Sequence, residues 1–203
     1  MPENEDGGYR SRLKSRMVEI ARGLLETEGL MAVQARRVTG MAECSVGTLY
    51  NVFNGLDGLI ITVNTQTLKE LGGALDAALA ESRGQSIGER LMALAQSYLD
   101  FAEAHPKRWK AIFEHRFMSS KAAETMLGPY RADQNELFKL VEALLEGPMP
   151  NGMDRPNLAR ALFAAVHGIV MMALDEKLGN YNRDETLSRI RFIISAGVVA
   201  LKR

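Results

Sequence analysis

The chain has 203 residues, of which 46% are hydrophobic and 25% charged, a composition typical of a globular protein with room for a small head and a larger body. Its 25 basic and 25 acidic residues cancel, so overall charge says nothing about a nucleic-acid partner. The single cysteine, Cys44, excludes an internal disulfide, and no Cys/His cluster has zinc-site spacing, which favours a reducing, cytoplasmic location.

The first eight residues, MPENEDGG, are acidic and glycine-rich, unlike a secretory signal, and we predict that residues 1–8 form a disordered arm. The longest apolar runs are split by His167 and Gly168, so no membrane span is predicted. Beyond the arm, apolar residues recur at helical spacing and no period-2 pattern persists. The sequence therefore predicts an all-α protein.

Three helices are predicted near the start of the chain. The first runs from Tyr9 to Glu28 and is stopped by the glycine that follows it. Two short helices come next, Val33–Gly40 and Ser45–Tyr50, with only Met41–Cys44 between them. This is helix-turn-helix spacing, so residues 9–56 are predicted to form a compact three-helix head.

Residues 57–203 are predicted to form a helical body. One helix of the body should begin at Pro106, because proline suits the first turn of a helix and disfavours helix in its predecessor. A helical stretch over residues 120–146 should be kinked or broken at Gly128 and Pro129. The chain is predicted to close with a loop and two helices: Gly147–Pro156, Asn157–Leu178 and Asp184–Leu201.

The second helix of such a unit enters the major groove of DNA and must be short and slim. Ser45 can cap this helix, and Gly47 permits a close approach. Thr48 and Tyr50 offer hydroxyl groups to phosphates. The large apolar residues of the segment are expected to pack inward: Leu49 and Phe53.

The segment SVGTLYNVF, Ser45–Phe53, resembles the recognition helix of the tetracycline-repressor family of transcription regulators, and the similarity extends over Gly29–Leu59. The resemblance implies a homodimer that binds a pseudo-palindromic double-stranded operator, more often as a repressor, and that a small-molecule effector releases. By residue match it implies DNA contacts at seven positions, the first two to bases and most of the others to the backbone: Arg36, Val46, Ser45, Gly47, Thr48, Tyr50 and Asn51.

Three positions depart from the family pattern. Glu43 stands at a turn position usually held by glycine, Thr39 replaces a small alanine, and Leu56 replaces a common lysine. A carboxylate repels phosphates and a missing lysine removes a charge contact, so non-specific DNA binding should be weak. The stretch Arg10–Arg37, with seven basic and three acidic residues, would compensate in part, although such a stretch is also typical of a solvated helix face.

Ligand pockets in helical bodies are mostly apolar, with a few polar groups that orient the ligand. We expect a small, largely apolar effector and no cofactor or metal. The candidate lining consists of aromatic and methionine side chains with one histidine: Met92, Tyr98, Trp109, Phe113, Phe117, Met118, Met126, Phe163, His167 and Met171. Each of them is also compatible with plain core packing, as is Cys44 in the turn.

The last two helices are the predicted dimer surface, because two helices from each protomer can form a four-helix bundle. The alternative is a core within one protomer. The predicted contact stripe is apolar and steps by three and four residues: Leu162, Ala165, Ile169, Met172, Ile190, Ile194 and Val198.

An enzyme is not predicted, since no nucleophile, metal-binding or phosphate-loop motif is found in the sequence. A dimeric helical interaction module that has lost DNA binding stays open as an alternative because of Glu43 and Leu56. It predicts a folded dimer that is indifferent to DNA.

Overall fold

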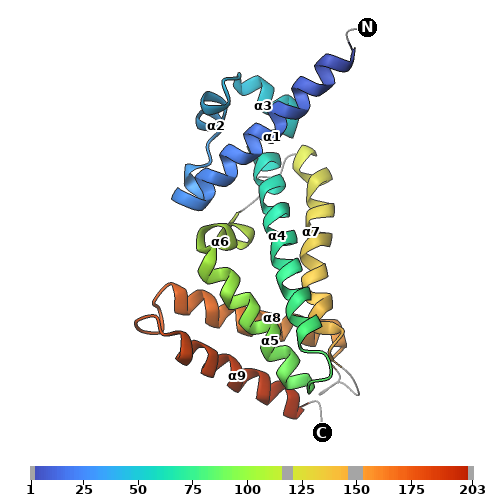
Figure 1. Cartoon of the computed structure of the whole chain (residues 1–203), viewed down its shortest axis with the longest axis vertical. Coiled ribbons are helices and arrows are strands. Elements are labelled where there is room, and N and C mark those ends of the chain that lie inside the picture. Colours follow the sequence, from blue (N-terminus) through green and yellow to red (C-terminus); the bar gives the residue numbers. More distant parts are fainter. Residues whose placement is uncertain (1–2, 116–120, 146–152, 201–203) are drawn as a thin grey trace. The chain divides into compact units, whose positions relative to one another are not determined.

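The computed structural model describes residues 3–115, 121–145 and 153–200. Within these ranges the chain folds into α-helices joined by short turns (Figure 1), which confirms the all-α prediction. The helices, with one 3-10 turn labelled η1, are α1 (Glu3–Glu28), η1 (Leu30–Ala32), α2 (Ala35–Ala42), α3 (Val46–Phe53), α4 (Leu56–Glu81), α5 (Ile87–Ala104), α6 (Pro106–Glu114), α7 (Lys121–Glu142), α8 (Arg155–Leu174) and α9 (Arg183–Ala200).

The helices pack into two compact units. The head unit comprises Met1–Lys69 and His105–Asp133, and the body unit comprises Glu70–Ala104 and Gln134–Arg203. Helices α4 and α7 contribute to both units, and α6 packs with the head. The packing boundary therefore differs from the predicted functional boundary between residues 56 and 57.

Two helices are longer than predicted. Helix α1 begins at Glu3, so residues 3–8 are helical instead of forming an arm. Helix α7 continues through Gly128 and Pro129 without a break. The next residue, Tyr130, is buried and donates its hydroxyl to the Ile112 carbonyl (3.1 Å). This packing offsets the backbone hydrogen bond that proline cannot donate.

The core of the head unit is built on the apolar stripe of α1, which Met17, Ala21 and Leu24 represent. Against it pack side chains from α2, α3 and α4. Helix α1 ends at Gly29, whose amide donates to the Leu24 and Leu25 carbonyls (3.2 and 3.0 Å). Its φ of 93° confirms that glycine is needed there, although its ψ of −178° is extended and not left-handed helical.

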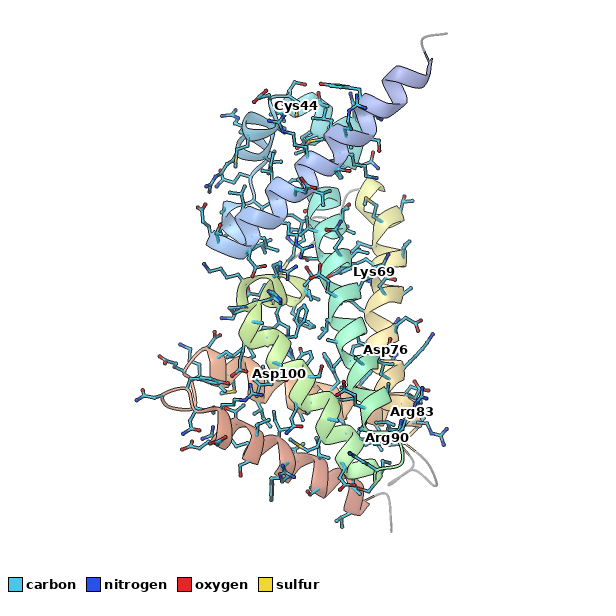
Figure 2. All side chains as sticks on the ribbon, in the orientation of Figure 1. Cys44, Lys69, Asp76, Arg83, Arg90 and Asp100 are labelled. Carbon is cyan, nitrogen blue, oxygen red and sulfur yellow. The ribbon has the colours of Figure 1, made fainter. Side chains whose placement is uncertain are left out.

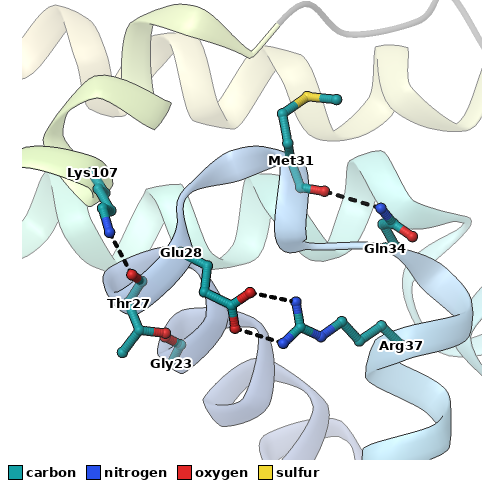
Figure 3. Close-up of polar contacts among 7 residues, drawn as sticks. All are labelled: Gly23, Thr27, Glu28, Met31, Gln34, Arg37 and Lys107. Atoms are coloured by element: carbon teal, nitrogen blue, oxygen red, sulfur yellow. Dashed lines mark hydrogen bonds and ion pairs between the residues drawn. The ribbon is translucent and has the colours of Figure 1, made fainter.

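Helix α6 is joined to the C-terminal end of α1 by polar contacts within the head unit. Arg108 is only 1% exposed and forms an ion pair with Glu26, whose carboxylate also lies 3.2 Å from His105 Nδ1. Lys107 Nζ donates to the Thr27 carbonyl in the last turn of α1 (Figure 3). A cation is favoured there because the C-terminal end of a helix carries partial negative charge. Because the Arg108 guanidinium is buried, loss of Glu26 would leave that charge without this partner, so the ion pair ties α6 to α1.

In the body unit α8 and α9 pack against α5 and against each other. The two helices approach closely at Gly197, where an added Cβ would lie 2.9 Å from Leu162 Cδ2. The turn between them is fixed by Arg183, which pairs with Asp100 and Glu103 of α5. This packing holds α8 and α9, the two helices of the predicted dimer surface, together within the body unit.

Three of the predicted dimer residues are in fact core residues of the body unit: Leu162, Ile190 and Ile194. They offer a partner little surface, because α5 and the neighbouring helix already cover that face. Ala165, Ile169 and Val198 are half-buried, and Met172 is 45% exposed. The exposed large apolar side chains of α9 are Phe192 (72% exposed) and Val199 (53%), and neither belongs to the predicted stripe.

Helix α8 is long and apolar enough to cross a membrane by length and composition, with a mean hydropathy of 1.6 over its best window. Core helices of soluble proteins can pass the same test. Here Leu158, Leu162 and Val170 face the core of the body unit, while Ala161 and Met172 do not. Within the single chain, α8 is therefore buried on one face and exposed on the other.

Candidate nucleic-acid interface and ligand cavity

The turn between α2 and α3 consists of Glu43, Cys44 and Ser45. Glu43 caps α2 in the left-handed conformation (φ 56°, ψ 45°), the geometry for which glycine is usual. Ser45 caps α3 as predicted: its Oγ accepts from the Thr48 amide (3.1 Å) and lies 2.9 Å from Thr48 Oγ1. Two eight-residue helices thus follow each other across three residues, as a helix-turn-helix requires.

Helix α3 has one buried and one exposed face. Leu49 and Phe53 point into the core of the head unit, which confirms their predicted role. The exposed face carries most of the predicted DNA contacts: Val46, Gly47, Tyr50 (55% exposed) and Asn51. Ser45 and Arg36 are also exposed, whereas Thr48 is half-buried beside Ser45. The structure therefore brings the predicted residues to one end of the head unit.

The family departures have local structural explanations. Thr39 is buried, and its hydroxyl donates to the Ala35 carbonyl (2.9 Å), so its polarity is satisfied. Leu56 is half-buried at the start of α4 and packs against the core of the head unit, so a lysine there would lose apolar contact. The Glu43 carboxylate lies 3.2 Å from Arg16 Nη2, which compensates its charge.

Cys44 (Figure 2) is half-buried, and its Sγ lies 3.9 Å from Met17 Sδ. Burial raises the pKa of its thiol. A protonated, half-buried thiol is a poor nucleophile, which supports the interpretation of Cys44 as a packing residue.

The body unit contains a small cavity of about 50 Å³ between α4, α5, α7, α8 and α9. Leucine, valine and isoleucine side chains form most of its wall, and no charged residue among the described parts of the chain lines it. Of the residues predicted to line a pocket, Phe163 and Tyr98 line this cavity. The cavity is far smaller than a drug-sized site of roughly 300–1,000 Å³, so a larger effector must displace side chains to enter.

An aromatic cluster places one polar pair beside this cavity. The Tyr98 hydroxyl lies 2.7 Å from His167 Nδ1, and the Phe163 ring stacks on the imidazole with centroids 5.8 Å apart. Burial lowers the pKa of His167, so its imidazole is neutral at pH 7. The pair can orient a neutral ligand by hydrogen bonding.

The other predicted pocket residues do not gather around this cavity. Trp109, Phe113 and Met126 belong to the head unit, where Trp109 is fully buried and its ring meets that of Phe113 edge-on (5.9 Å). Met92 faces an open groove between α4, α5 and α9, and Met171 is half-buried in α8. Phe117 and Met118 lie outside the described residues. The lining leucines were missed because a leucine beside a cavity has the same spacing as one in a filled core.

The depressed pKa of His167 predicts pH-dependent stability. The unfolded chain protonates this histidine near its ordinary pKa, 6.5, while the folded chain does so only at lower pH. The unfolded state therefore binds more protons below pH 6.5, and the free energy of unfolding should fall as pH drops from 7.5 to 5.5. Urea unfolding at both pH values should show a smaller fall for His167→Gln than for the parent. If the free energy of unfolding fell equally in both proteins, the depressed pKa of His167 would not be the cause.

A capped recognition helix behind a three-residue turn, on a head that buries the opposite face of that helix, defines a helix-turn-helix protein. The profile of the tetracyclin repressor-like C-terminal domain matches residues 91–191. This part of the chain therefore belongs to the C-terminal domain family of tetracycline repressor-like proteins. The comparison with curated proteins gave no match.

Solved structures with this fold share little sequence with the chain. A TetR-like transcriptional regulator from Rhodococcus sp. RHA1 is 19% identical, with a TM-score of 0.64 and coverage of 92% of this chain and 96% of its own. The multidrug binding protein EbrR, complexed with imidazole, is 19% identical (TM-score 0.61; 91% and 93%). The TetR family regulator PfmR from Thermus thermophilus is 15% identical (TM-score 0.54; 93% and 100%). At this identity they support the fold alone.

Proposed function

We propose that the protein is a cytoplasmic, ligand-responsive repressor that binds a pseudo-palindromic operator as a homodimer and is released by a small, largely apolar effector. The observation that carries the proposal is the exposed face of α3, which presents Val46, Tyr50 and Asn51 while its opposite face is buried. Eight residues at 1.5 Å each make a helix about 12 Å long, which matches the roughly 12 Å width of the major groove.

Contacts are assigned by side-chain chemistry. Arg36 and Val46 would face base edges, because a guanidinium pairs with guanine and an aliphatic group with the thymine methyl. The hydroxyls of Ser45, Thr48 and Tyr50 would bind phosphate oxygens, with Asn51 beside them: these contacts fix the register on the duplex.

The dimer is proposed to form through α8 and α9. On α8 the exposed and half-buried stripe steps by four, three and four residues through Ala161, Ala165, Gly168 and Met172. The space beside Gly168 is open, since an added Cβ would meet nothing within 4 Å. On α9 the stripe is Phe192, Ala196 and Val199. Apolar stripes of this spacing are what a four-helix bundle buries.

The effector is proposed to bind at the cavity beside Tyr98 and Phe163. Because no charged side chain of the described residues lines this cavity, a neutral ligand fits better than a cation or a carboxylate. The structure of EbrR with imidazole shows that a protein of this fold can hold a small heterocycle.

Capture of genomic DNA tests the proposed function. Purified protein is mixed with sheared DNA from its source in moderate salt, and bound fragments are sequenced. Enrichment of a palindrome supports an operator-binding regulator. If neither the protein as isolated nor protein refolded from denaturant without ligand enriches any sequence while remaining a folded dimer, the interaction module replaces the proposal.

Removal of single hydroxyl groups tests the recognition helix. Tyr50→Phe and Thr48→Ala should each weaken binding to the enriched operator by about 1 kcal/mol, roughly fivefold, since each removes one hydrogen bond. Stability should change by less than ~1 kcal/mol. Tyr181→Phe, which removes a hydroxyl bonded to Glu103 in the body unit, is the matched control. If both head variants bind like the parent in a titration, the assignment of α3 is wrong.

A further inference from the structure

Helix α1 places one arginine near each end of α3. Arg10 Nη2 donates to the carbonyl of Asn51, near the C-terminal end of α3 (3.0 Å). Arg16 Nη2 donates to the Met41 carbonyl (3.1 Å) and the Glu43 carboxylate (3.2 Å), in and beside the turn that precedes α3. Figure 1 shows α3 beside α1. Both arginines are exposed.

This spacing suits the two walls of a major groove. Arg10 and Arg16 are six residues apart, about 9 Å along the axis of α1, and α3 is about 12 Å long. A helix of that length in the groove has a sugar-phosphate backbone near each end. A guanidinium has five N–H donors, and the contacts described above use only the Nη2 atom of each arginine. Further donors are therefore left for phosphate oxygens.

The Arg16–Glu43 pair does not prevent such a contact. The Glu43 side chain is 79% exposed, and exposed ion pairs contribute only about 0–1 kcal/mol. A phosphate can therefore replace the carboxylate on Arg16. Glu43, the turn residue that departs from the family pattern, then lowers DNA affinity in two ways: it occupies Arg16, and it repels the backbone.

We propose that Arg10 and Arg16 are DNA-backbone contacts that α1 contributes on either side of the recognition helix, and that Glu43 competes with DNA for Arg16. The proposal rests on the proposed function. It adds a sequence-independent clamp to the contacts assigned to α2 and α3, and it explains how a head with a carboxylate in its turn can still hold a phosphate backbone.

The test compares Arg10→Ala and Arg16→Ala with the parent in salt titrations on two duplexes of equal length: one enriched from genomic DNA by the parent and one of random sequence. The slope of log K against log salt is negative, and each variant should reduce its magnitude by about one. Each variant should also weaken binding to both duplexes by the same factor, roughly 3–10-fold at low salt. Arg83→Ala (Figure 2) removes the same charge from the body unit and should leave the slope unchanged.

Further variants distinguish the loss of a charge contact with DNA from an effect on folding. Arg10→Lys and Arg16→Lys should keep the parental slope, since they keep the charge. Glu43→Gln should strengthen binding to both duplexes, and the gain should be smaller in the Arg16→Ala background because the two residues interact. An additive gain would contradict the competition for Arg16.

Three results would overturn the proposal. Unchanged slopes for both alanine variants, with a parent that binds, would show that α1 does not touch the backbone, while the proposed function would stand. A loss confined to the enriched duplex would make the arginines positioning residues for α3. If the parent protein binds neither duplex, both the proposed function and this inference are wrong.

Discussion

Phe192→Glu is expected to convert the protein from a dimer to a monomer at micromolar concentration. Phe192 is 72% exposed in the single chain, and full burial of a phenylalanine contributes about 1.5–3 kcal/mol. A two-fold interface contains the residue twice, so both protomers lose this contribution and both bring a carboxylate into an apolar contact. A loss of roughly 3–6 kcal/mol raises the dimer dissociation constant at least a hundredfold.

Sedimentation velocity over a concentration series measures this change directly. Met31→Glu is the matched control, because Met31 is an exposed apolar residue of the head unit that lies outside the proposed interface. The control should stay a dimer. Operator binding by Phe192→Glu should fall with the dimer, because one head reads only one half-site. A Phe192→Glu protein that remains a dimer would exclude α9 from the interface.

The sequence was informative about the head because the signals there are local. The Ser45 cap, the inward residues Leu49 and Phe53, and the glycine stop after Glu28 each depend on neighbours within a few residues. Local signals of this kind survive in any packing arrangement. The family resemblance then added what local signals cannot give, namely a prediction of which exposed residues face DNA.

The sequence was less informative about α9 because both faces of that helix are apolar. Ile190 and Ile194 step by four residues, as do Phe192 and Ala196 on the other face. Periodicity identifies both stripes but does not show which of them is buried within the protomer. Only the packing of α9 against α5 and α8 shows that Ile190 and Ile194 are core residues. The exposed stripe is therefore the one with surface left for a partner.

Compensating contacts between distant residues were also invisible in the sequence. Glu43 was recognised as unusual, but Arg16, which pairs with it, lies 27 positions away. Pro129 was expected to disturb α7, yet the buried Tyr130 anchors the helix there to Ile112 of α6. In both cases a tertiary contact decides the outcome of a local preference.

Gly58→Ala is expected to destabilise the head unit by about 1–3 kcal/mol, because it overpacks a backbone contact. A Cβ at residue 58 would lie 1.7 Å from the carbonyl oxygen of Phe53, the last residue of α3. Backbone atoms cannot move aside as the end of a flexible side chain can, so α3 must shift relative to α4. The shift would carry the exposed face of α3 with it, and operator binding should fall together with stability.

Gly23→Ala is the matched control for this change. Gly23 lies inside α1 with nothing within 4 Å of an added Cβ, so alanine there should stabilise the protein by about 0.5–1 kcal/mol through helix propensity alone. Urea unfolding followed by circular dichroism should therefore show a lower free energy of unfolding for Gly58→Ala and a higher one for Gly23→Ala than for the parent. If Gly58→Ala were as stable as the parent, the close approach of α3 and α4 would not hold, and the position of the recognition helix would have to be reconsidered.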